Sequence, residues 1–212
     1  MPYSSLGIGD ITEAMYSRQP ERVTKLMANT TAAIAGVGGL GTHVALLLAR
    51  SGIGKLLLAD KDVVEPSNLG RQHYYIDQIG LPKVTATEFM MRFLRPGLQV
   101  EAKQMNLTSD NFAETFKEAD IVFECFDSEE SKLMAYNVAV TQMKETPFIM
   151  ASGVAGIKSG NLIHTKKLKN NVILVGDEQS DLSEGLVAAR VVAVAALQVL
   201  AGIRVLLKED NV

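Results

Sequence analysis

The sequence of 212 residues has no tryptophan and a single cysteine, Cys125. One cysteine cannot form an intramolecular disulfide, and it excludes the zinc sites that are built from several cysteines. The three histidines, His43, His73 and His164, do not have the spacing of a metal-binding motif. We therefore expect neither a disulfide nor zinc in this protein.

Positive charge is also scarce. The sequence has 21 Lys and Arg residues and 24 Asp and Glu residues, so the formal net charge at pH 7 is −3. Proteins that bind nucleic acid usually carry a basic excess that this chain does not have. We expect no nucleic acid partner, although a local cationic pocket is compatible with this balance.

Long apolar segments without polar interruption are missing too. The most apolar segment, residues 185–207, contains Arg190, Gln198 and Arg204, which would be costly to bury in a membrane. Residues 1–19 lack the basic and apolar blocks of a signal peptide. We expect a packed helix at 185–207, no membrane association and a cytoplasmic protein.

What the sequence does contain is an alternation of strand-like and helix-like segments. The predicted strands lie at 30–35, 55–60, 98–103, 119–127 and 146–153, with helices between them at 41–50, 82–95, 110–116 and 129–144. This alternation predicts an α/β fold: a doubly wound, mostly parallel, Rossmann-like sheet with helices on both faces.

The two ends of the chain depart from this alternation. Residues 161–166 and 171–176 could pair as strands, which would give a mixed C-terminal extension before the helix at 185–207. Residues 1–29 are expected to form a helical segment that packs on the core. Because no linker, repeat or low-complexity tract interrupts the sequence, we predict a single domain over residues 1–212.

A glycine-rich stretch, GVGGLG at residues 36–41, follows a predicted strand and opens a predicted helix. Gly36, Gly38 and Gly41 match the G-x-G-x-x-G spacing, and Gly39 allows a still closer approach of the backbone. A helix N-terminus after such a turn offers free backbone N–H groups and a partial positive charge to phosphate. The stretch therefore predicts a nucleotide-binding turn.

Acidic residues follow two of the predicted strands. Asp60 lies nineteen residues after Gly41, at the position where an acid accepts hydrogen bonds from ribose hydroxyls. Asp62 could be a second ligand or a solvated turn residue. Asp127, at the end of the fourth predicted strand, is suited to bind magnesium beside a phosphate chain, and it could also cap the next helix.

Three further polar residues surround a loop rich in turn-forming residues. Arg71 can contact phosphate oxygens with a planar fork, Lys83 supplies a point charge, and Asn68 adds neutral hydrogen bonds. Two cations beside a glycine turn suit a triphosphate better than the pyrophosphate of a dinucleotide. The alternative is that both cations are ordinary surface charges.

With these residues in place, the sequence resembles the ThiF/MoeB/HesA family, bacterial relatives of ubiquitin-activating enzymes. The resemblance spans about residues 16–205 and rests on GVGGLGTHVALLLARSGIGKLLLADKDVVEPSNLGRQ, IGLPK and FECFDSEESK. The segments ASGVAG and VILVGD look closest to the compact ThiF branch of thiamine biosynthesis. Unlike many members, this chain has no CxxC pair, which agrees with the expected absence of zinc.

The resemblance implies ATP-dependent adenylation of the C-terminal glycine of a ubiquitin-like, ThiS-like sulfur carrier protein, with release of pyrophosphate. It also assigns roles to individual residues of this sequence. Asp60 would hold the ribose and Asp127 the magnesium ion, and Arg18 would reach the ATP of the partner in a homodimer. The ATP phosphates would be held by Asn68, Arg71 and Lys83, and Gln72 of the same N-L-x-R-Q motif would join the ATP-binding set.

Three alternatives remain at this point. A nicotinamide-dependent oxidoreductase would explain the glycine turn and Asp60, but it leaves Arg71, Lys83 and Asp127 without a role. A non-catalytic homologue that binds a nucleotide or a partner is the second. A family member that adenylates a molybdopterin-type carrier, a tRNA base or a peptide is the third. Cys125 is expected to be buried and inert, so the reaction would stop at the acyl-adenylate.

Overall fold

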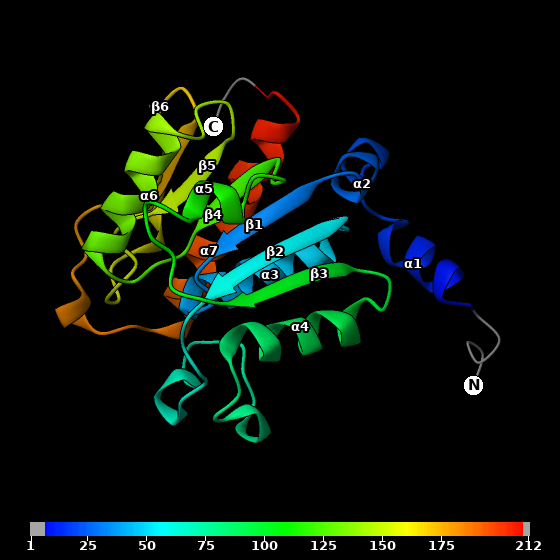
Figure 1. Cartoon of the computed structure of the whole chain (residues 1–212), viewed down its shortest axis with the longest axis horizontal. Coiled ribbons are helices and arrows are strands. Elements are labelled where there is room, and N and C mark those ends of the chain that lie inside the picture. Colours follow the sequence, from blue (N-terminus) through cyan, green and yellow to red (C-terminus); the bar gives the residue numbers. More distant parts are fainter. Residues whose placement is uncertain (1–6, 210–212) are drawn as a thin grey trace.

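One sheet of seven strands organises the computed structural model, which describes residues 7–209, and its strand order is β3-β2-β1-β4-β5-β7-β6 (Figure 1). The strands are β1 (Thr31–Ala35), β2 (Lys55–Asp60), β3 (Gln99–Gln104), β4 (Ile121–Glu124), β5 (Phe148–Ala151), β6 (His164–Lys169) and β7 (Val172–Gly176). All neighbours pair in parallel except β6, which pairs antiparallel with β7. The predicted mostly parallel sheet with a mixed C-terminal extension is confirmed.

Helices cover both faces of this sheet, as the sequence predicts (Figure 1). One face carries α3 (Gly39–Arg50), α4 (Lys83–Leu94) and α7 (Ala188–Leu206), and the other carries α5 (Phe112–Thr115) and α6 (Glu129–Thr141). Two N-terminal helices, α1 (Ile8–Tyr16) and α2 (Glu21–Ala28), lie at one end of the sheet. Short 3₁₀ turns occupy Pro66–Asn68 (η1), Ile76–Gln78 (η2), Gly160–Leu162 (η3) and Leu182–Glu184 (η4).

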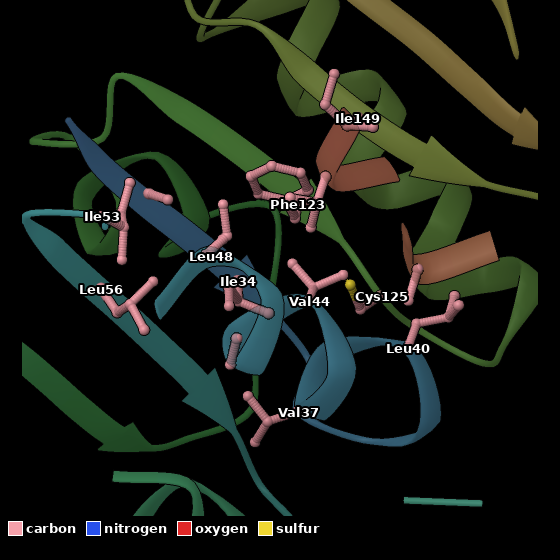
Figure 2. Close-up of a cluster of buried hydrophobic side chains, with 14 of the residues drawn as sticks. Ile34, Val37, Leu40, Val44, Leu48, Ile53, Leu56, Phe123, Cys125 and Ile149 are labelled. Atoms are coloured by element: carbon pink, nitrogen blue, oxygen red, sulfur yellow. The ribbon is translucent and has the colours of Figure 1, made fainter. Parts of the chain in front are cut away.

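The central strands are apolar on both sides because each side faces a separate core. In β2, Leu56 and Leu58 point into the core below α3 and α4, whereas Leu57 and Ala59 point into the core below α5 and α6. Strand side chains alternate in direction, so a continuous apolar run is what a sheet covered on both faces requires. Figure 2 shows the first of these cores, where Ile34 lies among side chains from α3, β2 and β4.

The most apolar helix, α7, is the packed helix that the sequence predicts. Among the described residues, α7 is long and apolar enough to cross a membrane. Length and composition alone do not distinguish such a helix from a core helix of a soluble protein. The helix α7 contacts α3, β5 and β7, and Gln198 at its middle is fully buried. The Gln198 amide donates hydrogen bonds to the carbonyl oxygens of Glu124 and Ile149. These contacts fix the middle of the helix against β4 and β5.

The fourth strand is shorter than the predicted 119–127. It ends at Glu124 because the chain turns there: the N–H of Phe126 bonds back to Glu124 Oε1 at 2.7 Å. Asp127 therefore lies in the loop between β4 and α6 rather than at the end of the strand.

Candidate nucleotide-binding site

A cavity of about 370 Å³ opens at the carboxyl ends of the parallel strands. The volume is in the range of small-molecule sites, and the strand order reverses here, since β1 has β2 on one side and β4 on the other. Most of the residues predicted for nucleotide binding line this cavity: Gly36, Gly38, Gly39, Asp60, Asp62, Arg71, Gln72, Lys83 and Asp127.

The glycine turn connects β1 to α3 at the floor of the cavity. Gly36 has a φ of +87°, a left-handed conformation that favours glycine. A Cβ atom on Gly41 would lie 1.9 Å from the carbonyl oxygen of Gly36, so only glycine allows the helix to start this close to the strand. Gly41 does not itself line the cavity; its role in this structure is to bring the N-terminus of α3 next to β1.

Asp60, the last residue of β2, holds the glycine turn in place. Its Oδ2 accepts a hydrogen bond from the N–H of Val37 at 2.8 Å, and its Oδ1 accepts one from the N–H of Asp62 at 2.8 Å. Burial raises the pKa of this carboxyl, although the two N–H donors and the nearby Lys83 oppose that effect. Each carboxylate oxygen keeps a second lone pair, so Asp60 can still accept hydrogen bonds from a ligand hydroxyl.

Lys83 is the first residue of α4, and it is buried although it carries a charge. Its Nζ lies 3.0 Å from Asp62 Oδ2, and its backbone N–H donates to the carbonyl oxygen of Asp62 at 2.9 Å. The Lys83 side chain is 9% exposed and that of Asp62 is 50% exposed. The pair thus places one enclosed positive charge and one accessible carboxylate at the edge of the cavity.

Arg71 and Gln72 enter from the loop that follows β2. Arg71 is half-buried, and its Nη1 donates to the carbonyl oxygen of Ser67 at 3.0 Å, which leaves other guanidinium N–H groups for a ligand. Gln72 is buried, and its Oε1 has no hydrogen-bond partner within the described residues 7–209. A buried acceptor without a partner on a cavity wall is a group that a bound ligand can satisfy.

Asp127 lies on the opposite wall, and its side chain is exposed. The helix cap that its sequence position allowed is made by its neighbour instead: Ser128 Oγ accepts a hydrogen bond from the N–H of Ser131 at 3.2 Å. Asp127 is therefore not the capping side chain, and its carboxylate is accessible from the cavity. An exposed carboxylate facing a phosphate site is a suitable Mg²⁺ ligand.

Besides Gly41, two residues predicted for the site do not line the cavity. Asn68 is buried, and its Oδ1 accepts a hydrogen bond from the N–H of Glu65 at 3.0 Å within its own loop. Arg18 follows α1, where Tyr16 and Gln19 donate hydrogen bonds to carbonyl oxygens at the end of α3. The cavity lies at the other end of this twelve-residue helix, about 18 Å away. The roles of Asn68 and Arg18 stay predictions.

The sequence did not predict an ion pair between Lys132 and a buried Glu124 in the wall below Asp127. Lys132 Nζ lies 2.9 Å and 3.2 Å from the two carboxylate oxygens of Glu124, and it also donates to the carbonyl oxygen of Ala151 at 2.9 Å. The Glu124 side chain is fully buried, and Lys132 lines the cavity. An acidic residue inside the apolar segment of β4 was the available signal, because a buried carboxylate requires a partner.

Two other parts of the cavity wall also went unpredicted. Met105, Asn106 and Leu107 follow β3 and line the cavity, as the rule on strand ends would have suggested. The loop before α7 contributes Ser180, Asp181, Leu182 and Leu186, and no pattern in the sequence pointed to it.

Cys125 is buried, as predicted. Burial raises the pKa of its thiol well above the usual range, so the thiolate form that acts as a nucleophile is disfavoured. In the described part of the chain, no group of three or more His, Cys, Asp or Glu residues is arranged to hold a metal ion.

The chain is similar to known proteins in sequence and in fold. Ubiquitin-like modifier-activating enzyme 5 of Gallus gallus is 40% identical over 137 residues, which cover 59% of this chain and 34% of that protein. The chain thus matches about a third of the length of this relative. Among solved structures, E. coli tRNA N6-threonylcarbamoyladenosine dehydratase, TcdA, in complex with ATP has a TM-score of 0.84 at 20% identity, covering 96% of this chain and 98% of TcdA.

E. coli MccB with ATP has a TM-score of 0.72 at 23% identity, covering 92% of this chain and 64% of MccB. At these identities the two structures show the shared fold. The model of the ThiF family matches residues 13–212, nearly the whole sequence. The chain therefore belongs to the ThiF family, a family of ATP-using adenylyltransferases.

Proposed function

We propose that this protein uses ATP to adenylate the C-terminal glycine of a ubiquitin-like carrier protein, with release of pyrophosphate. The observation that carries the proposal is the convergence of a glycine turn, Asp60, Arg71, Lys83 and Asp127 on one cavity at the strand ends. A nicotinamide enzyme would use the turn and Asp60 but would have no need for the two cations and the facing carboxylate.

The chemistry of this reaction matches the groups that are present. A C-terminal carboxylate is already ionised at pH 7, so its attack on the α-phosphate needs no general base. The obstacle is the repulsion between two anions, together with the charge that develops on the leaving pyrophosphate. Arg71 and Lys83 address both, because fixed cations at the edge of a cavity stabilise charge that grows in the transition state.

Asp127 would hold Mg²⁺ against the phosphate chain. Protein sites for Mg²⁺ commonly supply one or two carboxylates and leave the other positions to substrate phosphates and water. One exposed carboxylate on the cavity wall fits that pattern. When bound, Mg²⁺ would neutralise phosphate charge, while Asp60 and the N-terminus of α3 orient the ribose and the phosphates.

The carrier is proposed to be a ThiS-like sulfur carrier of thiamine thiazole biosynthesis. The similarity to ubiquitin-like modifier-activating enzyme 5 supports a ubiquitin-like partner, because the name of that protein states that it activates a ubiquitin-like modifier. A tRNA base is the second candidate, since TcdA shares the fold over 96% of this chain. The net charge of −3 favours the protein carrier over a polyanion.

We further propose that two copies of the chain form a homodimer in which Arg18 contacts the ATP of the partner. Arg18 is exposed and lies about a full helix length from the cavity of its own chain. If it acts on ATP at all, it must therefore act on the site of another copy. The alternative is a solvated arginine at the end of α1.

The test is ATP–pyrophosphate exchange with magnesium, with and without a purified ThiS-like protein that ends in Gly-Gly. Exchange that depends on the carrier is expected, because pyrophosphate re-forms ATP only through the acyl-adenylate. A carrier that lacks its last glycine is the matched control and should give background exchange. No exchange in a protein that binds ATP would refute the proposed reaction and favour a non-catalytic role or another acceptor.

A further inference from the structure

The side chain of Tyr74 joins two parts of the cavity wall that are far apart in the sequence. It is 5% exposed and comes from the loop between β2 and α4. Its hydroxyl donates to the carbonyl oxygen of Val37, in the middle of the glycine turn, at 2.6 Å. The carbonyl oxygen of Lys83 lies 3.3 Å from the same hydroxyl, and Thr87 Oγ1 lies 3.2 Å away.

These contacts connect the glycine turn to Lys83 along one side of the cavity. Both backbone polar groups of Val37 are held, because its N–H donates to Asp60 Oδ2 and its carbonyl oxygen accepts from Tyr74. Asp60 accepts from the N–H of Asp62, and Asp62 binds both the Nζ and the N–H of Lys83. The Lys83 carbonyl then faces the Tyr74 hydroxyl again.

We propose that the Tyr74 hydroxyl is a positioning group for nucleotide binding, which sets the glycine turn in register with Lys83. The inference rests on the proposed ATP site and adds a residue that none of its motifs contains. The turn supplies backbone N–H groups to the phosphates and Lys83 supplies a charge, so both bind ATP well only at a fixed mutual distance. Tyr74 is the side chain that touches both.

The ring of Tyr74 contributes to packing, whereas its hydroxyl contributes a hydrogen bond. The ring packs in a small cluster with Val64 and Ala86, which would persist with phenylalanine at this position. The hydroxyl donates the hydrogen bond that the carbonyl oxygen of the fully buried Val37 accepts. Burial raises the pKa of Tyr74 far above its ordinary value, so the hydroxyl is protonated and able to donate at neutral pH.

The test compares Tyr74→Phe with Tyr16→Phe in the full chain. Tyr16 is a matched control: it is also buried, and its hydroxyl donates to a backbone carbonyl, that of Ala49, at 3.0 Å at the far end of α3. Both variants lose one buried hydrogen bond and should show similar falls in the urea midpoint. Equilibrium binding of ATP and steady-state pyrophosphate exchange are then measured for each.

Tyr74→Phe is expected to raise the Kd and KM for ATP about fivefold, the equivalent of one lost hydrogen bond, with kcat changed less than about twofold. Tyr16→Phe should leave the Kd and KM unchanged. A Kd for ATP in Tyr74→Phe equal to that in Tyr16→Phe would overturn the inference. If the wild-type chain does not bind ATP at all, the proposed function fails and the inference fails with it.

A second variant keeps the test decisive if Tyr74→Phe does not fold. Thr87→Val keeps the shape of a fully buried side chain and removes the hydroxyl that contacts Tyr74 from the other side. It is expected to raise the Kd for ATP in the same direction, by about twofold. An unchanged Kd for ATP in folded Thr87→Val would then overturn the inference.

Discussion

Replacing Lys132 with methionine tests whether the ion pair below Asp127 is required for the fold. Methionine has a similar length and no charge, so Glu124 would keep its buried position but lose its cation. Glu124 Oε1 would retain the N–H of Phe126 at 2.7 Å, and Oε2 would retain the N–H of Ala151 at 3.4 Å. The substitution therefore leaves a carboxylate that is 0% exposed with two backbone donors and no positive partner.

The magnitude follows from that burial. Breaking a buried pair by removing one partner costs about 3–5 kcal/mol, because an uncompensated charge remains inside the protein. The Lys132 side chain is 23% exposed, so water reaches the site and the lower end, about 3 kcal/mol, applies. For a chain of this size each kcal/mol lowers the Tm by about 2–4 °C, which predicts a fall of about 6–12 °C.

The assay is urea unfolding followed by circular dichroism, with Glu124→Gln/Lys132→Met as the matched control. The double variant removes both charges, and the single glutamine oxygen can still accept the 2.7 Å hydrogen bond from the N–H of Phe126, although the longer one from Ala151 is lost. It should recover most of the stability that the single variant loses. A loss below about 1 kcal/mol in Lys132→Met would refute the reasoning, since a surface pair would give that value. An equal loss in the double variant would show that packing, and not charge, is responsible.

Three further predictions concern the site, and a fourth concerns stability in acid. Arg71→Ala and Lys83→Ala should each lower pyrophosphate exchange by about 10²-fold or more, and wild-type rates in either would contradict their role as phosphate ligands. Asp127→Ala should raise the Mg²⁺ concentration needed for half-maximal exchange, so an identical magnesium titration would count against it. Mixing Arg18→Ala chains with Asp127→Ala chains should restore one working site per heterodimer; no recovery would place Arg18 outside the partner's site. Burial raises the pKa of Asp177, but hydrogen bonds from Ser180 and the N–H of Gln179, with the Arg190 charge, lower it to about 2. The stability that ionised Asp177 contributes is therefore complete above the pKa of the unfolded state, near 4, and is lost as the pH falls toward 2. The free energy of unfolding of Asp177→Asn should accordingly fall less than that of the wild type between pH 4 and pH 2.

The fold was predictable because its signals are local. An apolar run such as Leu56–Ala59 needs both faces of a sheet covered, and GVGGLG between a strand and a helix allows few other conformations. The parallel sheet then brings Asp60 and the glycine turn together, because the carboxyl ends of neighbouring strands lie along one edge. Sequence spacing alone was enough to place these groups in one cavity.

Contacts between distant segments were not predictable in the same way. Nothing near Tyr74 in the sequence indicates that its hydroxyl meets Val37, since that contact depends on how the loop after β2 folds back over the glycine turn. Asn68 is a different case: its motif suggests a phosphate ligand, which stays a prediction, and the contact that the structure shows lies within its own loop. The position of Asp127 in the sequence allowed it to cap the next helix, but the structure shows that the Ser128 side chain makes the cap.

The position of α7 has a consequence for how the protein is made. The helix comprises residues 188–206, and it covers β5, β7 and α3, which starts at residue 39. On a ribosome, α3 leaves the exit tunnel well before α7 is synthesised, so the apolar side of α3 and the adjoining strands stay exposed during elongation. Chains that stall before residue 188 would present this surface to other nascent chains, and such exposed apolar surfaces are what chaperones bind. The apolar side of α3 is therefore covered only when α7, the last helix of the described residues to be synthesised, docks onto it.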